Sequence, residues 1–101
     1  MAGTIVKICG ITRLEDAQGA VAAGADWLGF ILKGESPRLV TPGAARAIRD
    51  GLARRTTTVA VMVQPLPEEA LRLATGAGAA RVQLHGVDPA RWPADFPLPA
   101  A

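Results

Sequence analysis

Short apolar runs alternate along this chain with longer segments in which apolar and polar residues are mixed. Four runs rich in Val, Ile, Leu and other apolar residues are predicted to be β-strands: residues 4–9, 27–32, 59–63 and 80–84. The segments between them predict helices over residues 12–23 and 41–54, and from residue 67 to the glycines at 76 and 78. The pattern therefore predicts a repeated strand–helix alternation.

The predicted helix starts depend on residues that suit the free backbone N–H groups of a first turn. Thr12, with Glu15 three residues later, has the pattern of a capping box. Thr41 precedes Pro42, and proline is favoured at the first helical position. The acidic residues at 68–69 follow the third start, where the helix dipole favours negative charge.

Near-continuous apolar strands that alternate with helices are typical of an α/β protein with a parallel sheet and helices over its faces. Open flavodoxin-like sheets and closed (β/α)₈ barrels both begin in this way, and periodicity alone does not separate them. The pattern ends after Gly86. Later prolines leave room only for a turn around Arg91, so residues 89–101 are predicted to form an irregular, proline-rich tail.

Composition limits the classes of protein to which the chain can belong. Its 101 residues suit one small domain, and 11 Lys and Arg against 9 Asp and Glu leave a dispersed net charge of +2. We therefore expect no nucleic-acid partner and no membrane surface. One Cys and one His exclude an intramolecular disulfide and a structural zinc site. A cytoplasmic protein is the expectation.

Candidate functional residues are expected at the carboxyl ends of the predicted strands, where parallel sheets bind their ligands. Cys9 ends the first strand, and residues 33–38 form the loop after the second. Gln64 follows the third strand, while Gln83 and His85 end the fourth. Gln83 either fills the inner side of the sheet or faces a ligand.

Cys9 is the single thiol of the chain, and three roles stay open for it. Cysteine is often a small buried hydrophobic residue with no chemical role. Its place before a glycine and a helix start favours a thiolate that acts as a base or a nucleophile. A nucleophilic pair with His85 is a further alternative, which requires geometry that spacing does not show.

Arg38 lies in a loop of turn-forming residues, Gly34-Glu35-Ser36-Pro37-Arg38. Most loop arginines are solvated. An arginine in a long loop after a parallel strand is also suited to bind a carboxylate through two parallel hydrogen bonds. No glycine-rich phosphate motif of the Walker or dinucleotide-binding type occurs, so nucleotide binding has no support.

Several motifs follow one another in a set order and spacing: Lys7-Ile8-Cys9-Gly10-Ile11-Thr12, Gly24-Ala25-Asp26 with Gly29-Phe30, Ser36-Pro37-Arg38, and Val82-Gln83-Leu84-His85-Gly86. Together, from about residue 4 to residue 86, they resemble the phosphoribosylanthranilate isomerases of tryptophan biosynthesis. The resemblance implies that residues 1–88 are the N-terminal half of a (β/α)₈ TIM barrel. We call this unit of four βα repeats a half-barrel.

The reaction of that family is an Amadori rearrangement of N-(5-phosphoribosyl)anthranilate to 1-(2-carboxyphenylamino)-1-deoxyribulose 5-phosphate. A general acid opens the furanose to a Schiff base, and a cysteine base then removes the proton from the adjacent sugar carbon. The resemblance implies that Cys9 is this base and that Arg38 binds the anthranilate carboxylate. It implies pocket-lining positions for Gln83 and His85, and neither a metal nor an organic cofactor.

The resemblance covers only part of the family's catalytic machinery. The family's general acid is an aspartate at the end of the sixth strand, and loops after the seventh and eighth strands hold the phosphate. The chain matches neither, so we expect it to be inactive alone and to self-associate through two open half-barrel edges. Two classes of function stay open: the N-terminal part of an isomerase, and a non-catalytic α/β fragment or binding module.

Overall fold

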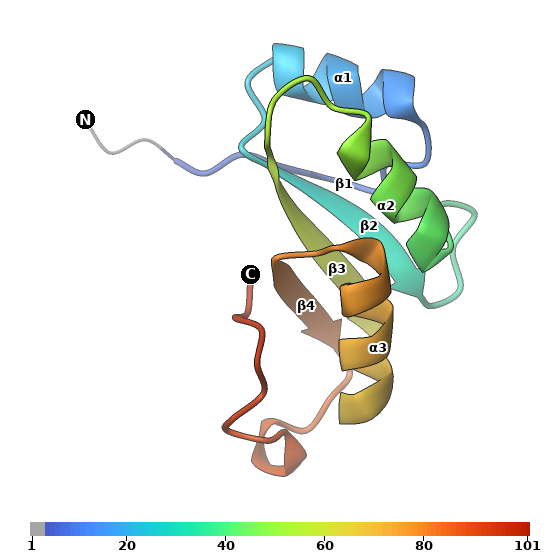
Figure 1. Cartoon of the computed structure of the whole chain (residues 1–101). Helices are drawn as coiled ribbons and strands as arrows, with labels where there is room; N and C mark the ends of the chain where they lie inside the picture. The colour runs from blue at the N-terminus through green and yellow to red at the C-terminus, as the bar shows by residue number, and fades with distance from the viewer. Residues whose placement is uncertain (1–3) are drawn as a thin grey trace.

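The computed structural model describes residues 4–101, so the first three residues of the predicted 1–88 unit lie outside it. Its strands are β1 (Lys7–Cys9), β2 (Trp27–Lys33), β3 (Thr57–Val63) and β4 (Arg81–His85). The helices are α1 (Leu14–Ala22), α2 (Pro42–Asp50) and α3 (Pro67–Ala77), and a 3₁₀ turn, η1, spans Pro89–Arg91. Figure 1 shows the strands and helices in strict alternation.

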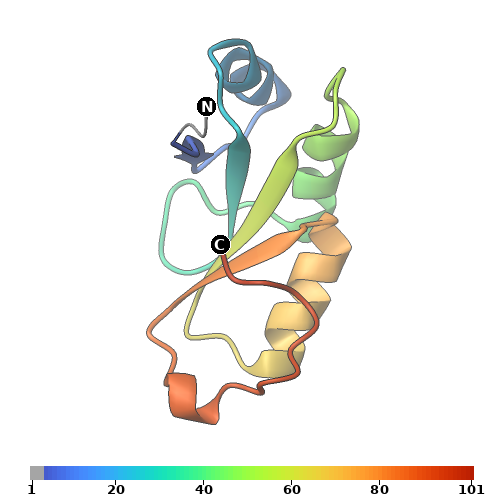
Figure 2. The ribbon, with the colours of Figure 1, turned by 90° about the vertical axis from the view of Figure 1, so that its left-hand side faces the viewer.

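The strands form one parallel sheet in the order β1-β2-β3-β4. Each strand after the first therefore pairs with the strand that precedes it in the chain. Figure 2 shows α2 and α3 together on one side of the sheet. An open flavodoxin-like sheet has a different order, because its second strand lies outside its first. The sequential order is that of a barrel, in which right-handed crossovers place every helix on the outer face.

The core lies between the helices and the outer face of the sheet. Leu28 and Phe30 of β2, Ala60 and Met62 of β3, and Val82 of β4 alternate onto this face and are buried. The helices contribute mostly alanine: Ala17, Ala45, Ile48, Ala70, Ala74 and Ala77. Small helix side chains let the helices lie close to the sheet, so a chain with few aromatic residues still fills its core.

The inner face of the sheet is partly covered by its own side chains. Val59 and Val61 of β3 alternate onto this face and are 0% and 6% exposed. The guanidinium carbon of Arg81 on β4 lies 4.8 Å from the ring centroid of Trp27 on β2. This cation–π pair spans β3 and shields part of it from water.

The tail after η1 returns to the outer edge of β4. The Val82 N–H donates to the Pro99 carbonyl at 3.0 Å, and the Ala101 N–H donates to the Val82 carbonyl at 2.8 Å. Three apolar side chains of the tail pack against the core: Trp92, Phe96 and Leu98. The expectation that both outer edges are open is therefore wrong at Val82 of β4, which the tail covers, whereas β1 has no second strand neighbour among residues 4–101.

Local capping signals predicted one helix start correctly and another wrongly. Thr41 is the N-cap of α2, and its Oγ1 accepts the Ala44 N–H at 3.1 Å. At α1 the N-cap is Arg13 rather than Thr12, and no side chain caps this end. The two N–H groups that follow β1, those of Gly10 and Ile11, both donate to the Gly29 carbonyl, which fixes the chain just before the predicted start.

Other element ends differ from the predicted ones. Helix α2 ends at Asp50 rather than residue 54, with Gly51 as its C-cap. Strand β1 begins at Lys7 rather than residue 4, since the Val6 N–H binds the Asp26 carboxylate at 2.9 Å. A tertiary partner, the Asp26 carboxylate, thus binds the chain just before β1.

Candidate active site

Cys9 is an exposed thiol at the carboxyl end of β1, and it lies against Gly29 on β2. The two residues pair across the sheet. A Cβ built on Gly29 falls 3.0 Å from the Cys9 Sγ and 3.2 Å from its Cα. The Gly29 carbonyl also accepts the N–H groups of Gly10 and Ile11, at 3.0 and 3.2 Å. Glycine at position 29 therefore lets β1 approach closely and orients the thiol.

Arg38 comes to the same place from the loop between β2 and α2. The Ser36 Oγ accepts the Arg38 N–H at 3.1 Å, which shapes the turn. A Cβ built on Gly10 falls 2.8 Å from the Arg38 Cδ and 3.2 Å from its Nη1, so the arginine side chain lies across Gly10. Gly10 has φ +84°, which favours glycine as well. The structure thus brings the exposed Arg38 beside the residue that follows Cys9.

Gln83 and His85 lie two residues apart on β4 and so share the inner face of the sheet. The Gln83 Nε2 and the His85 Nε2 are 3.0 Å apart, a hydrogen bond in which the amide donates. The Gln83 Oε1 is buried and has no hydrogen-bond partner among the described residues. This oxygen is an acceptor in need of a donor on the inner side of the half-barrel.

Cys9 and His85 do not meet. They lie on β1 and β4, the first and last strands of the sheet, with β2 and β3 between them. Three strand spacings amount to about 14 Å along the sheet, far beyond hydrogen-bond reach. The structure gives no support to a nucleophilic Cys–His pair and leaves Cys9 as a separate thiol next to Arg38.

An ion pair that the sequence analysis did not identify also lies at the carboxyl ends of the strands. The Lys33 Nζ lies 2.6 Å from the Glu69 Oε1 and 3.4 Å from the Gln64 carbonyl. Hydrogen bonds from Lys33 and from the Leu66 N–H hold the pKa of Glu69 below its ordinary value of 4.5. The ion pair thereby connects the carboxyl end of β2 to the first turn of α3. The one signal in the sequence was Glu69 itself, at the third position of a predicted helix.

Gln64 connects the carboxyl ends of β3 and β4. It has φ +49°, and its N–H donates to the His85 carbonyl at 2.7 Å. Its side chain lies over Gly86, where a built Cβ would fall 2.8 Å from the Gln64 Cγ. The contacts of Gln64 are therefore structural, and they set the position of the residues on either side of it.

Several carboxylates are engaged away from Cys9: Asp16 with Arg13, Asp26 with the Val6 N–H, Asp50 with Arg49, and Asp88 with the Ala90 N–H. Within residues 4–101 no group of three or more His, Cys, Asp or Glu side chains is arranged to hold a metal ion. The same residues include no helix that is long and apolar enough to cross a membrane. The four side chains that the sequence predicted for the site thus supply one thiol, one guanidinium, one amide and one imidazole.

Comparison with known proteins identifies the family. The family model described as N-(5'-phosphoribosyl)anthranilate (PRA) isomerase matches residues 6–99. The curated N-(5'-phosphoribosyl)anthranilate isomerase of Geobacter sulfurreducens is 51% identical over 84 residues, which are 83% of this chain and 41% of the relative. That of Chlorobium luteolum is 46% identical over 83 residues, or 82% and 38%. The chain spans about two fifths of the length of these relatives.

Solved structures agree with the sequence matches. The crystal structure of phosphoribosyl anthranilate isomerase from Thermus thermophilus has a TM-score of 0.82 and 49% identity, covering 88% of this chain and 44% of that one. A phosphoribosyl anthranilate isomerase in complex with reduced 1-(o-carboxyphenylamino)-1-deoxyribulose 5-phosphate has a TM-score of 0.80 and 42% identity, with 87% and 45% covered. The predicted first half of a TIM barrel is confirmed, and the chain belongs to the phosphoribosylanthranilate isomerase family.

Proposed function

We propose that this chain supplies the base-bearing half of a phosphoribosylanthranilate isomerase site, with Cys9 as general base and Arg38 as the group that binds the anthranilate carboxylate. The observation that carries the proposal is the position of the Arg38 side chain across Gly10, next to Cys9. One residue type suits proton abstraction and the other suits bidentate carboxylate binding. A related enzyme binds a reduced product that contains a carboxyphenyl group and a phosphate, as this proposal requires.

In the proposed reaction the substrate nitrogen pushes its electron pair to the anomeric carbon as an acid protonates the ring oxygen. The ring opens to a protonated Schiff base. The Cys9 thiolate then removes the proton from the adjacent sugar carbon, and that C–H electron pair forms a carbon–carbon double bond while the nitrogen regains its own pair. The resulting enolamine takes a proton at the first carbon while the hydroxyl group on the second carbon loses its proton, and this tautomerisation gives the ketone. Gln83 and His85, which are hydrogen-bonded to each other on the inner face, line the pocket.

The chain by itself is proposed to be inactive. The proposed cycle needs an acid for the ring oxygen and a site for the phosphate. Asp26 and Asp50 cannot act as the acid, because their carboxylates bind the Val6 N–H and Arg49 near the amino ends of the strands. The second half of a barrel has to provide both functions. If no second half restores activity, the alternative interpretation applies: the chain is a non-catalytic fragment or a binding module.

A complementation experiment tests the proposal. The chain is mixed with a separately produced C-terminal half of the Geobacter sulfurreducens relative, and turnover is followed by the loss of substrate fluorescence. Each half alone should be inactive, and the mixture should be active. Cys9→Ser in the mixture should lower kcat by about 10²–10⁴, the usual contribution of one proton-transfer group. Thermal unfolding of both forms of the chain checks that the serine variant is folded.

Two outcomes would contradict parts of the proposal. Near-normal turnover of the Cys9→Ser mixture would remove Cys9 from the role of base. If the wild-type halves sediment together and remain inactive, the chain is a non-catalytic fragment.

We further propose that the isolated chain self-associates through the outer edge of β1. Three apolar residues at this edge are exposed: Ile5, Val6 and Ile8. Unpaired strand edges of this kind attract a second strand. The single thiol also suits a reducing compartment, and we propose the cytoplasm as the place of action.

A further inference from the structure

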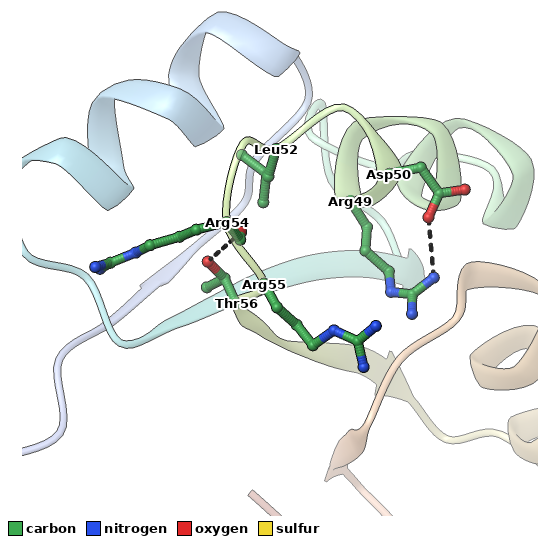
Figure 3. A pocket seen from close by; sticks show the side chains of 6 residues that line it. All are labelled: Arg49, Asp50, Leu52, Arg54, Arg55 and Thr56. Atoms are coloured by element: carbon green, nitrogen blue, oxygen red, sulfur yellow. Dashed lines mark hydrogen bonds and ion pairs between the residues drawn. The ribbon is translucent and has the colours of Figure 1, made fainter.

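A second group of charged residues lies at the amino ends of the strands. Cys9 and Arg38 lie at the opposite, carboxyl ends. A pocket of about 200 Å³ opens here between the end of α2 and the start of β3. Its lining residues are Arg49, Asp50, Leu52, Arg54, Arg55 and Thr56, which Figure 3 shows as sticks. The proposed isomerase function uses none of these residues.

Two of the three arginines converge, and the third does not. Arg49 comes from the last turn of α2 and Arg55 from the loop before β3, and in Figure 3 their side chains extend to the same side of the loop. Arg54 points the opposite way. Arg49 and Arg55 also line an adjoining hollow of about 210 Å³, whose wall includes the threonines at 56–58. Arg49, Arg55 and Thr56 are thus common to the walls of both hollows.

Positive charge exceeds negative charge around the pocket. The Arg49 Nη1 lies 3.0 Å from the Asp50 Oδ1, and this carboxylate is largely exposed. Among residues 4–101, no carboxylate lies within ion-pair distance of Arg55. A Cβ built on Gly78 falls 2.9 Å from the Arg49 Nη1, and Gly78 has φ +68°. The close passage over Gly78 holds the Arg49 guanidinium against the body of the protein.

We infer that Arg49 and Arg55 form a binding site for a phosphate group. A phosphate has more oxygens and more negative charge than a carboxylate, so it is the anion better suited to accept hydrogen bonds from two guanidinium forks at once. The pocket volume accommodates such an anion together with water. Asp50 competes with the anion for Arg49, so the site is weak and its affinity is set in part by this carboxylate.

Titration of the full 101-residue chain with inorganic phosphate, at constant ionic strength set with chloride, tests the inference. The Nε–Hε NMR signals of Arg49 and Arg55 should shift in a saturable manner. Arg55→Ala should weaken binding about tenfold, the loss of one charge-assisted pair. Arg55→Lys, which keeps the charge and loses the fork, should weaken it less. Asp50→Asn should strengthen binding severalfold, which a purely structural role for Asp50 does not predict.

Arg54→Ala is the matched control, since it removes the same charge from the adjacent residue that points away. It should leave phosphate affinity within twofold. An effect of Arg54→Ala as large as that of Arg55→Ala would show general charge attraction and overturn the inference. Shifts that do not saturate, or an unchanged affinity in Asp50→Asn, would overturn it too. The Asp50→Asn and Arg55→Lys variants keep the test decisive if Arg55→Ala unfolds.

Discussion

Replacing Gly29 with alanine tests how closely β1 and β2 approach at the candidate active site. The new Cβ would lie 3.0 Å from the Cys9 Sγ, 3.2 Å from its Cα and 3.3 Å from its Cβ. The Cα belongs to the backbone, so no side-chain rotation relieves all three contacts. β1 must move away from β2, against the hydrogen bonds that the Gly29 carbonyl accepts from Gly10 and Ile11.

The expected cost follows from these contacts. Overpacking of this size typically destabilises by about 1–3 kcal/mol. Alanine restricts the unfolded chain more than glycine does, which offsets roughly 0.5–1 kcal/mol. We expect Gly29→Ala to lower the free energy of unfolding by about 1 kcal/mol, the difference between the middles of these two ranges. The displacement of β1 should also change the rate at which Cys9 reacts with a thiol reagent in the native state.

Urea unfolding followed by tryptophan fluorescence measures this effect, at one protein concentration because self-association shifts apparent stability. Gly19→Ala in α1 is the matched control, since no heavy atom lies within 4 Å of a Cβ built there. The control should gain about 0.5–1 kcal/mol from helix propensity. If Gly29→Ala is as stable as the wild type while the control behaves as expected, the argument from close approach is refuted.

Three further predictions concern the site and the edges of the sheet. In the reconstituted enzyme, Arg38→Ala should weaken substrate binding about tenfold or more, because a charge-assisted pair contributes roughly 1.5–3 kcal/mol. Arg38→Lys should restore only part of the affinity, and an equal loss for an analogue without the carboxylate would contradict the assignment. The lowered pKa of Glu69 means that its ion pair with Lys33 stabilises the fold above about pH 4.5 and is lost as the pH falls through the lower folded-state pKa. Glu69→Gln should therefore reduce the dependence of the unfolding free energy on pH between about pH 6 and 3, as measured by urea unfolding. An unchanged dependence would contradict a stabilising ion pair. Ile5→Lys should reduce self-association in sedimentation velocity, whereas Leu66→Lys, at another exposed apolar residue far from the β1 edge, should not.

Interactions between residues close in the chain were determined by the sequence. Thr41 caps the helix that begins at Pro42, and Gly78 ends α3 in a left-handed conformation, both as predicted. The alternation of strands and helices and the family likeness are also properties of the linear sequence. Such features are predictable because a cap, a turn or an apolar repeat involves residues within one or two helical turns of one another.

The tertiary structure decided which distant residues meet. Arg38 reaches Gly10 because the β1-β2 pairing and the loop after β2 bring them to one edge, and no local pattern encodes that contact. The N-cap of α1 is Arg13, although the local capping pattern indicated Thr12. The separation of Cys9 from His85 follows from the strand order, which periodicity leaves open. Contacts of this kind depend on the order in which strands pair and on the face where helices cross, and both are set by packing the whole chain at once.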